Sequence, residues 1–296
     1  MESRIQYVPN IDIDREKYDR CVRLSPRGRI YAQSWYLDCV TERWDALVLG
    51  DYEAVMPFAR RRKYGISYIY PPPWTQQLGV FGEDGHSSLS EWHFLRSIPF
   101  RFLFVDYMLG AESEPEGPGL AKRSNFVLRL DRDFDALREG FNANRRRISR
   151  YPFEGMRLER EGDAEELLRL YAGMPLDYPV HRDGLQKMKC LLREGKNAVS
   201  VWTVHRHGSL LGGLIWCRDA RRITYLLPVN PPASREWNLS SFVLLRLIRD
   251  FQGSGLELDL MGSMDPGVSD FYRSFGATEE VYYRLQRKFT RHVPGR

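Results

Sequence analysis

A tyrosine and an aspartate near the C-terminus are the residues of this chain whose types and spacing best suit chemistry. Tyr272 lies in the run Asp270–Ala277, where aromatic residues flank it and a glycine follows, which predicts a short helix closed by a turn. A phenol can protonate a leaving group as a general acid, a contribution of about 10²–10⁴-fold to a rate. An aromatic ring packed between helix and sheet is the alternative, and both stay open.

The second candidate, Asp259, lies in the apolar run 256–261, which predicts a buried strand. Because side chains alternate along a strand, Asp259 faces away from Leu258 and Leu260. A carboxylate at the end of such a strand can accept the proton of an attacking amine or orient that amine. A buried structural acid paired with an arginine fits the position equally well.

Five further residues are candidates for binding an anionic cofactor or acyl donor. They are Arg145, Arg146, Asn238, Ser240 and Ser241. The two arginines belong to the basic run 142–151, an expected helix, and guanidinium groups pair well with phosphates. The other three lie at the start of a helix predicted over 240–253 or just before it, where free N–H groups attract anions. A solvated helix face also accounts for the arginines.

Composition predicts a cytoplasmic globular protein with a mild positive charge. The 296 residues are 43% hydrophobic and carry a formal charge of +5, which favours anionic partners but does not imply nucleic-acid binding. The four cysteines have no Cys-x-x-Cys spacing, so we expect neither a disulfide framework nor a metal site. No apolar segment follows the N-terminus or approaches eighteen residues, so neither a signal peptide nor a membrane span is expected.

The order of expected elements indicates a repeated α/β unit. Residues 156–287 read as a strand, two helices, three strands, a helix, a strand, a helix and a strand. The first half repeats this order weakly, so we expect a mixed-sheet α/β (α+β) protein of two tandem units, the first degenerate. The Glu-, Ser-, Pro- and Gly-rich stretch 111–119 precedes the expected boundary, which gives units 1–130 and 131–296.

This order resembles the fold of the GNAT acyltransferases, and its doubling resembles the Fem family of peptidoglycan aminoacyl transferases. The segments 142–151, 256–262 and 271–276 carry the likeness. It implies an N-acyltransferase that moves an acyl or aminoacyl group from a thioester or ester to an amine by direct attack. Tyr272 would be the acid, acyl-CoA the acyl donor, and a small-molecule or carrier-linked amine the acceptor.

Two departures from these families leave other functions open. GNAT enzymes usually hold the CoA pyrophosphate in a glycine-rich loop, but residues 228–238 contain no glycine, and their prolines lack N–H donors. Fem enzymes carry a lysine where Tyr272 stands. One alternative is therefore a non-catalytic GNAT-like binding module. The other is a Fem-like transferase that takes its group from aminoacyl-tRNA, the one nucleic acid expected here, and acts on cell-wall precursors.

Overall fold

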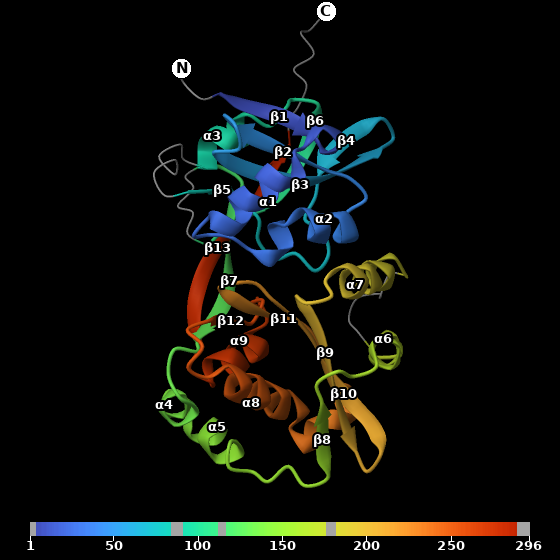
Figure 1. Ribbon diagram of the computed structural model, residues 1–296, viewed down its shortest axis with the longest axis vertical. Coiled ribbons are helices and arrows are strands. Elements are labelled where there is room, and N and C mark those ends of the chain that lie inside the picture. Colours follow the sequence, from blue (N-terminus) through green and yellow to red (C-terminus); the bar gives the residue numbers. More distant parts are fainter. Residues whose placement is uncertain (1–3, 84–90, 112–116, 176–181, 289–296) are drawn as a thin grey trace, which may run out of the picture. The chain divides into compact units, whose positions relative to one another are not determined.

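The chain forms two compact units, each built of strands and helices (Figure 1). The computed structural model describes residues 4–83, 91–111, 117–175 and 182–288. The first unit comprises residues 1–123 together with 281–296, and the second comprises residues 124–280. Helices and both parallel and antiparallel strand pairs occur, which confirms the predicted mixed α/β class.

In the first unit the strands follow the order β1-β2-β3-β4-β6-β13, and β5 pairs with β3. Its strands are β1 (Ile5–Pro9), β2 (Trp44–Leu49), β3 (Ala54–Lys63), β4 (Ile66–Ile69), β5 (Phe81–Gly82), β6 (Phe102–Leu109) and the greater part of β13 (Thr278–Lys288). Its α-helices are α1 (Arg15–Leu24), α2 (Ser34–Val40) and α3 (Glu91–Arg96).

The core of the first unit forms where α1 packs beside the central strands. Asp14 caps α1 by accepting a hydrogen bond from the N–H of Lys17, which fixes the start of the helix. Tyr18 on α1 is fully buried and its ring lies 5.1 Å from that of Trp44, the first residue of β2. Every residue of β2 is buried, as expected for a central strand covered on both faces.

The last strand departs from the expected division of the chain, because from Val281 onward it belongs to the first unit. β13 pairs antiparallel with β6, with Tyr283 opposite Leu109. Arg284 supports the pairing by an ion pair of 2.5 Å with Asp106. Hydrogen bonding to a distant strand leaves no local pattern in the sequence, so the boundaries 1–130 and 131–296 did not include this exchange.

In the second unit the strands follow the order β7-β12-β11-β10-β9-β8. Its strands are β7 (Leu120–Arg129), β8 (Met156–Glu159), β9 (Val199–Arg206), β10 (Ser209–Arg218), β11 (Arg222–Val229) and β12 (Glu257–Asp259). Its α-helices are α4 (Phe134–Glu139), α5 (Ala143–Ile148), α6 (Ala164–Ala172), α7 (Arg182–Glu194), α8 (Leu239–Phe251) and α9 (Pro266–Arg273).

Helices cover both faces of the sheet in the second unit, and two adjacent glycines of β10 show which helix covers which face. A Cβ atom on Gly212 would lie 2.6 Å from Leu239 of α8, whereas one on Gly213 would lie 3.0 Å from Leu167 of α6. Because neighbouring strand residues point to opposite faces, α8 and α6 lie on opposite sides of the sheet, as Figure 1 shows. The core of the second unit therefore lies between layers of helix and sheet.

The face under α8 holds an apolar cluster that fixes the helix on the sheet. Phe242 and Leu247 of α8 are buried in it together with Trp202, Leu214 and Leu258 of the strands. Apolar residues three and four apart along α8 face the sheet, which is the pattern that predicts this helix from the sequence. Among the described residues, no helix is long and apolar enough to cross a membrane.

Candidate functional site

β11 and β12 are parallel neighbours that stop pairing partway along β11. β12 covers only Glu257–Asp259, and its last pair joins Asp259 to Thr224. β11 continues to Val229 along its other neighbour, β10. Met261 takes a positive φ of 60°, which redirects the chain just after β12. The backbone of β11 beyond Thr224 therefore has no partner on β12.

A β-bulge marks the same point of β11. Cys217 of β10 lies opposite Thr224, but Ile215 lies opposite Leu227, so β11 has one residue more than β10 between these pairs. A bulge bends its strand and increases the local twist, and bulges are frequent next to active sites. Tyr225 and its neighbour Leu226 therefore lie outside the regular pairing of β11 with β10.

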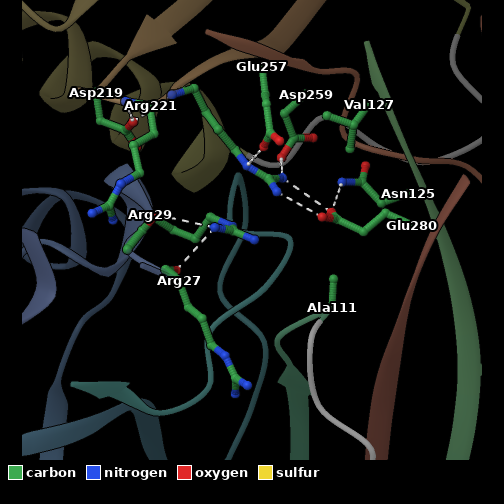
Figure 2. A network of polar contacts seen from close by, with 12 residues as sticks. Arg27, Arg29, Ala111, Asn125, Val127, Asp219, Arg221, Glu257, Asp259 and Glu280 are labelled. Carbon is green, nitrogen blue, oxygen red and sulfur yellow. Dashed lines mark hydrogen bonds and ion pairs between the residues drawn. The ribbon is translucent and has the colours of Figure 1, made fainter. Parts of the chain in front are cut away.

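Asp259 ends β12 at this fork and is fully buried. Arg222 donates to its Oδ2 at 3.1 Å, and the N–H of Met261 donates to its Oδ1 at 2.9 Å. Arg222 also forms ion pairs of 2.9 Å with Glu257 and 2.7 Å with Glu280. Figure 2 shows these three carboxylates around one guanidinium group. The arginine partner that the sequence left as an alternative for Asp259 is thus present.

Arg222 keeps its charge although it is buried. Burial by itself would lower the pKa of Arg222, but the hydrogen bond with Glu280 and the charges of three carboxylates outweigh it and raise the pKa. Asn125 of β7 donates to Glu280 at 2.9 Å and satisfies another acceptor of the cluster. A buried ion cluster of this kind is stable only while each charge has its partners. No pattern in the sequence marked Arg222 as a residue of the site.

Tyr272 lies on α9 with 8% of its surface exposed. Its ring centroid is 6.0 Å from that of Phe126 and 5.8 Å from that of Phe271. Burial, and after it the charge of Asp259, raises the pKa of the Tyr272 phenol to about 12. Its hydroxyl makes no hydrogen bond to any described residue. The structure thus brings a protonated phenol within the electrostatic reach of Asp259.

Tyr225 is a second phenol of this group, and it was missed by the sequence analysis. It is buried on β11 directly after the last residue that pairs with β12. Burial raises the pKa of Tyr225, and the nearby Tyr272 adds to the effect. The sequence offers no more than the position of Tyr225, one residue after Thr224 in the strand. The bulge that displaces it has no sequence signature.

α9 holds Tyr272 in place through its two ends. Asp265 caps the helix by accepting from the N–H of Val268 at 3.0 Å. At the other end Gly276 has a φ of 77°, and a Cβ atom there would lie 3.0 Å from the carbonyl oxygen of Gly140. The glycine of the aromatic motif therefore permits both the turn and a close approach of two backbones.

The start of α8 presents N–H groups that have no acceptor within the helix. Leu239, Ser240 and Ser241 form its first turn, and the side chain of the N-cap residue Asn238 makes no capping hydrogen bond to them. Asn238, which precedes them, takes a left-handed conformation with φ 53° and ψ 36°. Ser241 is buried and Ser240 is half-buried. This turn offers the dipole and the donors that anions prefer, without a glycine-rich loop before it.

Of the two candidate arginines, only Arg145 lies beside this turn. Its Nη1 donates to Ser241 Oγ at 2.7 Å and its Nε donates to Ser274 Oγ at 2.8 Å. Burial lowers the pKa of Arg145, which nonetheless stays charged at neutral pH. Arg146 instead donates to the main-chain oxygens of Glu139 and Phe141. In the described residues, no cluster of histidine, cysteine and acidic side chains could hold a metal ion.

Comparison with known proteins identifies the fold. No protein-family model matches the sequence, and no curated protein matches it. Among solved structures, FemX superposes with a TM-score of 0.67 at 12% identity, over 94% of this chain and 96% of FemX. A tandem GNAT protein from the clavulanic acid biosynthesis pathway gives 0.56 at 12% identity, over 97% of this chain and 100% of that protein.

A third similar structure is the C-terminal domain of a putative lysylphosphatidylglycerol synthetase from Agrobacterium fabrum. Its TM-score is 0.56 at 10% identity, over 93% of this chain and 91% of that domain. Identities this low define a fold and leave the activity to be argued from the site. The chain therefore has a GNAT/Fem-like fold of two tandem units, which confirms the resemblance drawn from the sequence.

Proposed function

We propose that the second unit transfers an acyl or aminoacyl group from a thioester or ester to an amine by direct attack. The observation that carries the proposal is that Tyr272 lies close enough to Asp259 for its charge to act on the phenol, at the place where β12 leaves β11. A forked pair of parallel strands beside a protonated phenol supplies a place for the reacting carbonyl and an acid for its leaving group. The fold likeness to FemX and the tandem GNAT protein supports this reaction class.

In this proposal Tyr272 is the general acid. The tetrahedral intermediate collapses as the bond from carbon to the leaving sulfur or oxygen breaks, and the phenol gives its proton to that atom. A pKa of about 12 keeps the phenol protonated at neutral pH before the step. The phenol is then reprotonated from water.

In this scheme Asp259 acts on the phenol of Tyr272 and not on the attacking amine. Each oxygen of its carboxylate already accepts a hydrogen bond, one from Arg222 and one from Met261, and the side chain is fully buried. A carboxylate so engaged is a poor acceptor for the proton of an amine. We infer that Asp259 holds the Tyr272 phenol in its neutral form, and that the amine loses its proton to water.

The developing oxyanion is stabilised by the backbone of β11 in this scheme. Beyond Thr224 the strand has no β12 partner, so an N–H on that edge can donate to the carbonyl oxygen of the acyl group. Donors held rigidly at the point where charge develops contribute more than flexible side chains. The bulge between Thr224 and Leu227 fixes the direction of these groups.

The anionic part of the acyl donor binds at the first turn of α8 beside Arg145. Free N–H groups at Leu239, Ser240 and Ser241 and the adjacent guanidinium fit one phosphate-sized anion. Residues 228–238 do not fit the wrapped pyrophosphate of the GNAT pattern, because they contain no glycine. Acyl-CoA and aminoacyl-tRNA, both of which carry phosphates, remain the two donor classes for this site.

The test is a screen of acyl donors against the full chain. Thermal unfolding is measured with acetyl-CoA, a long-chain acyl-CoA and aminoacyl-tRNA, and transfer to a panel of amines is followed by mass spectrometry. We expect at least one donor class to raise the unfolding temperature and to yield an acylated amine. A chain that no donor stabilises would instead be a non-catalytic binding module.

A single substitution then tests whether Tyr272 is the general acid. Tyr272→Phe should lower kcat by about 10²–10⁴-fold while the unfolding temperature changes little, because the ring is kept and the hydroxyl makes no hydrogen bond to described residues. Tyr171→Phe, a buried tyrosine of α6 in the same unit, is the matched control. Full activity of Tyr272→Phe would remove the phenol from the mechanism even if transfer were demonstrated.

A further inference from the structure

One end of the sheet in the first unit exposes large apolar side chains that the transferase site does not use. β3 and β4 form a hairpin (Figure 1). Tyr64 at its tip is 91% exposed. β4 and β6 are parallel and pair Ser67 with Phe102. Ile66, the first residue of β4, and Phe100, two residues before β6, therefore lie at the same end of adjacent strands, and they are 37% and 78% exposed.

A row of side chains extends this surface along one face of the sheet. Phe104 of β6, which is 43% exposed, lies opposite Tyr68 of β4 on one side and Lys288 of β13 on the other. Tyr68 in turn lies opposite Arg61 of β3. Residues directly opposite each other point to the same face, so the two aromatic rings lie between Lys288 at one end and Arg61, which forms an ion pair of 2.8 Å with Glu42, at the other.

The hairpin also carries positive charge beside its apolar tip. Arg62 and Lys63 are exposed, and in the described residues neither forms an ion pair with a carboxylate. Arg62 Nε donates to the carbonyl oxygen of Gly65 at 3.3 Å, and Lys63 Nζ lies 5.4 Å from the ring centroid of Tyr64. Charge and aromatic surface are therefore presented together at one tip.

We propose that this hairpin patch, formed by Arg62, Lys63, Tyr64, Ile66, Phe100 and Phe104, binds the surface of a bilayer that contains anionic phospholipid. Aromatic side chains favour the interface between headgroups and acyl chains, and basic residues are attracted to anionic lipid. A single-stranded nucleic acid would use the rings and the charges but has no use for exposed Ile66, which cannot stack on a base. This inference does not depend on the transferase proposal.

The test is co-sedimentation of the full chain with vesicles of two compositions. We expect binding to phosphatidylcholine vesicles that contain about one-third phosphatidylglycerol, weakened by salt, and little binding to pure phosphatidylcholine. Lys63→Glu should lower the partition coefficient at least about five-fold, and Tyr64→Ser should lower it as well. Lys196→Glu and Tyr151→Ser, exposed residues of the second unit, are the matched controls and should bind like the wild type.

Three results would overturn the proposal. The first is no difference between anionic and neutral vesicles, and the second is an equal loss in the hairpin variants and their controls. The third is hairpin-dependent binding of a labelled single-stranded RNA without binding to vesicles, which would make the patch a nucleic-acid surface. Far-ultraviolet circular dichroism checks that Tyr64→Ser is folded, which its position at an exposed tip leads us to expect.

Discussion

Arg145 donates a hydrogen bond of 2.7 Å to the hydroxyl of Ser241, and so joins the basic helix α5 to the first turn of α8. The guanidinium carbon of Arg145 also lies 4.7 Å from the ring centroid of Phe271, the neighbour of Tyr272 on α9. Three helices thus meet at one charged group. Its position is set by packing, which suits a residue that must hold an anion at a fixed place.

The first prediction concerns this charge. Arg145→Lys keeps a positive charge but cannot donate to both Ser241 and Ser274 from a planar group. We expect binding of the acyl donor found in the screen to weaken about tenfold or more, as for the loss of one hydrogen bond from a charged group. Isothermal titration calorimetry measures the effect.

Arg147→Lys is the control for this prediction. Arg147 lies on the same helix but is exposed, and it donates to Asn144 rather than to α8. The affinity of the Arg147→Lys variant for the acyl donor should stay within about twofold of the wild type, as expected for an exposed contact. Equal losses in the two variants would show that α5 acts through its overall charge, and Arg145 would have no particular place in the site.

The second prediction concerns the proton of Tyr272. The negative charge of Asp259 disfavours the phenolate, so removing that charge in Asp259→Asn should lower the pKa of Tyr272 from about 12 toward its ordinary value of 10. Burial remains in the variant and keeps part of the shift. Ultraviolet difference titration between pH 8 and 12 measures the ionisation.

The tyrosinate signal is assigned by repeating both titrations in the Tyr272→Phe background. The component that shifts in Asp259→Asn should be absent there. A Tyr272 pKa that is unchanged in Asp259→Asn would mean that the carboxylate does not act on the phenol. The role proposed for Asp259 would then have no basis, although the phenol could still be the acid.

The sequence predicted the elements of the second unit well, because their signals are local. The apolar spacing of α8, and the aromatic residues and glycine around Tyr272, lie within a few residues of the helices they define. Asp259 and Tyr272 could be singled out because each belongs to such a local pattern. Their proximity follows from the order of strands, which the resemblance to known folds implies and the residues alone do not.

The rest of the site depends on side-chain direction, which a sequence does not reveal. Three consecutive arginines on α5 point about 100° apart, and only Arg145 faces α8 while Arg146 turns to the preceding loop. Arg221 and Arg222 are likewise adjacent, yet one is exposed and the other lies buried among carboxylates. The pairing of β13 with β6 was missed for a related reason, since long-range pairing has no local signature.

The third prediction concerns the ion cluster at the fork. Arg222→Gln leaves the fully buried Asp259 without its cation, and removing one partner of a buried pair costs about 3–5 kcal/mol. We expect a loss of this size in the free energy of unfolding, measured by urea denaturation at neutral pH. Arg129→Gln, an exposed arginine of β7, should cost about 0.5 kcal/mol or less. Similar losses in both variants would contradict a structural role for the cluster.

The last prediction separates two costs of replacing a glycine. Gly253 has a φ of +69° but open space around it, so Gly253→Ala should cost about 1–2 kcal/mol of unfolding free energy from backbone strain alone. Gly212 has a φ of +150°, and a Cβ atom there would lie 2.3 Å from the carbonyl oxygen of Val229 and 2.6 Å from Leu239. The steric cost of overpacking is about 1–3 kcal/mol, so Gly212→Ala should be destabilised by more than Gly253→Ala.

Because the displaced groups belong to β11 and to the first turn of α8, Gly212→Ala should also weaken binding of the acyl donor, which Gly253→Ala should leave unchanged. Urea denaturation and calorimetry measure the two effects, and equal results for both variants would mean that the close approach of β10 to α8 does not shape the site.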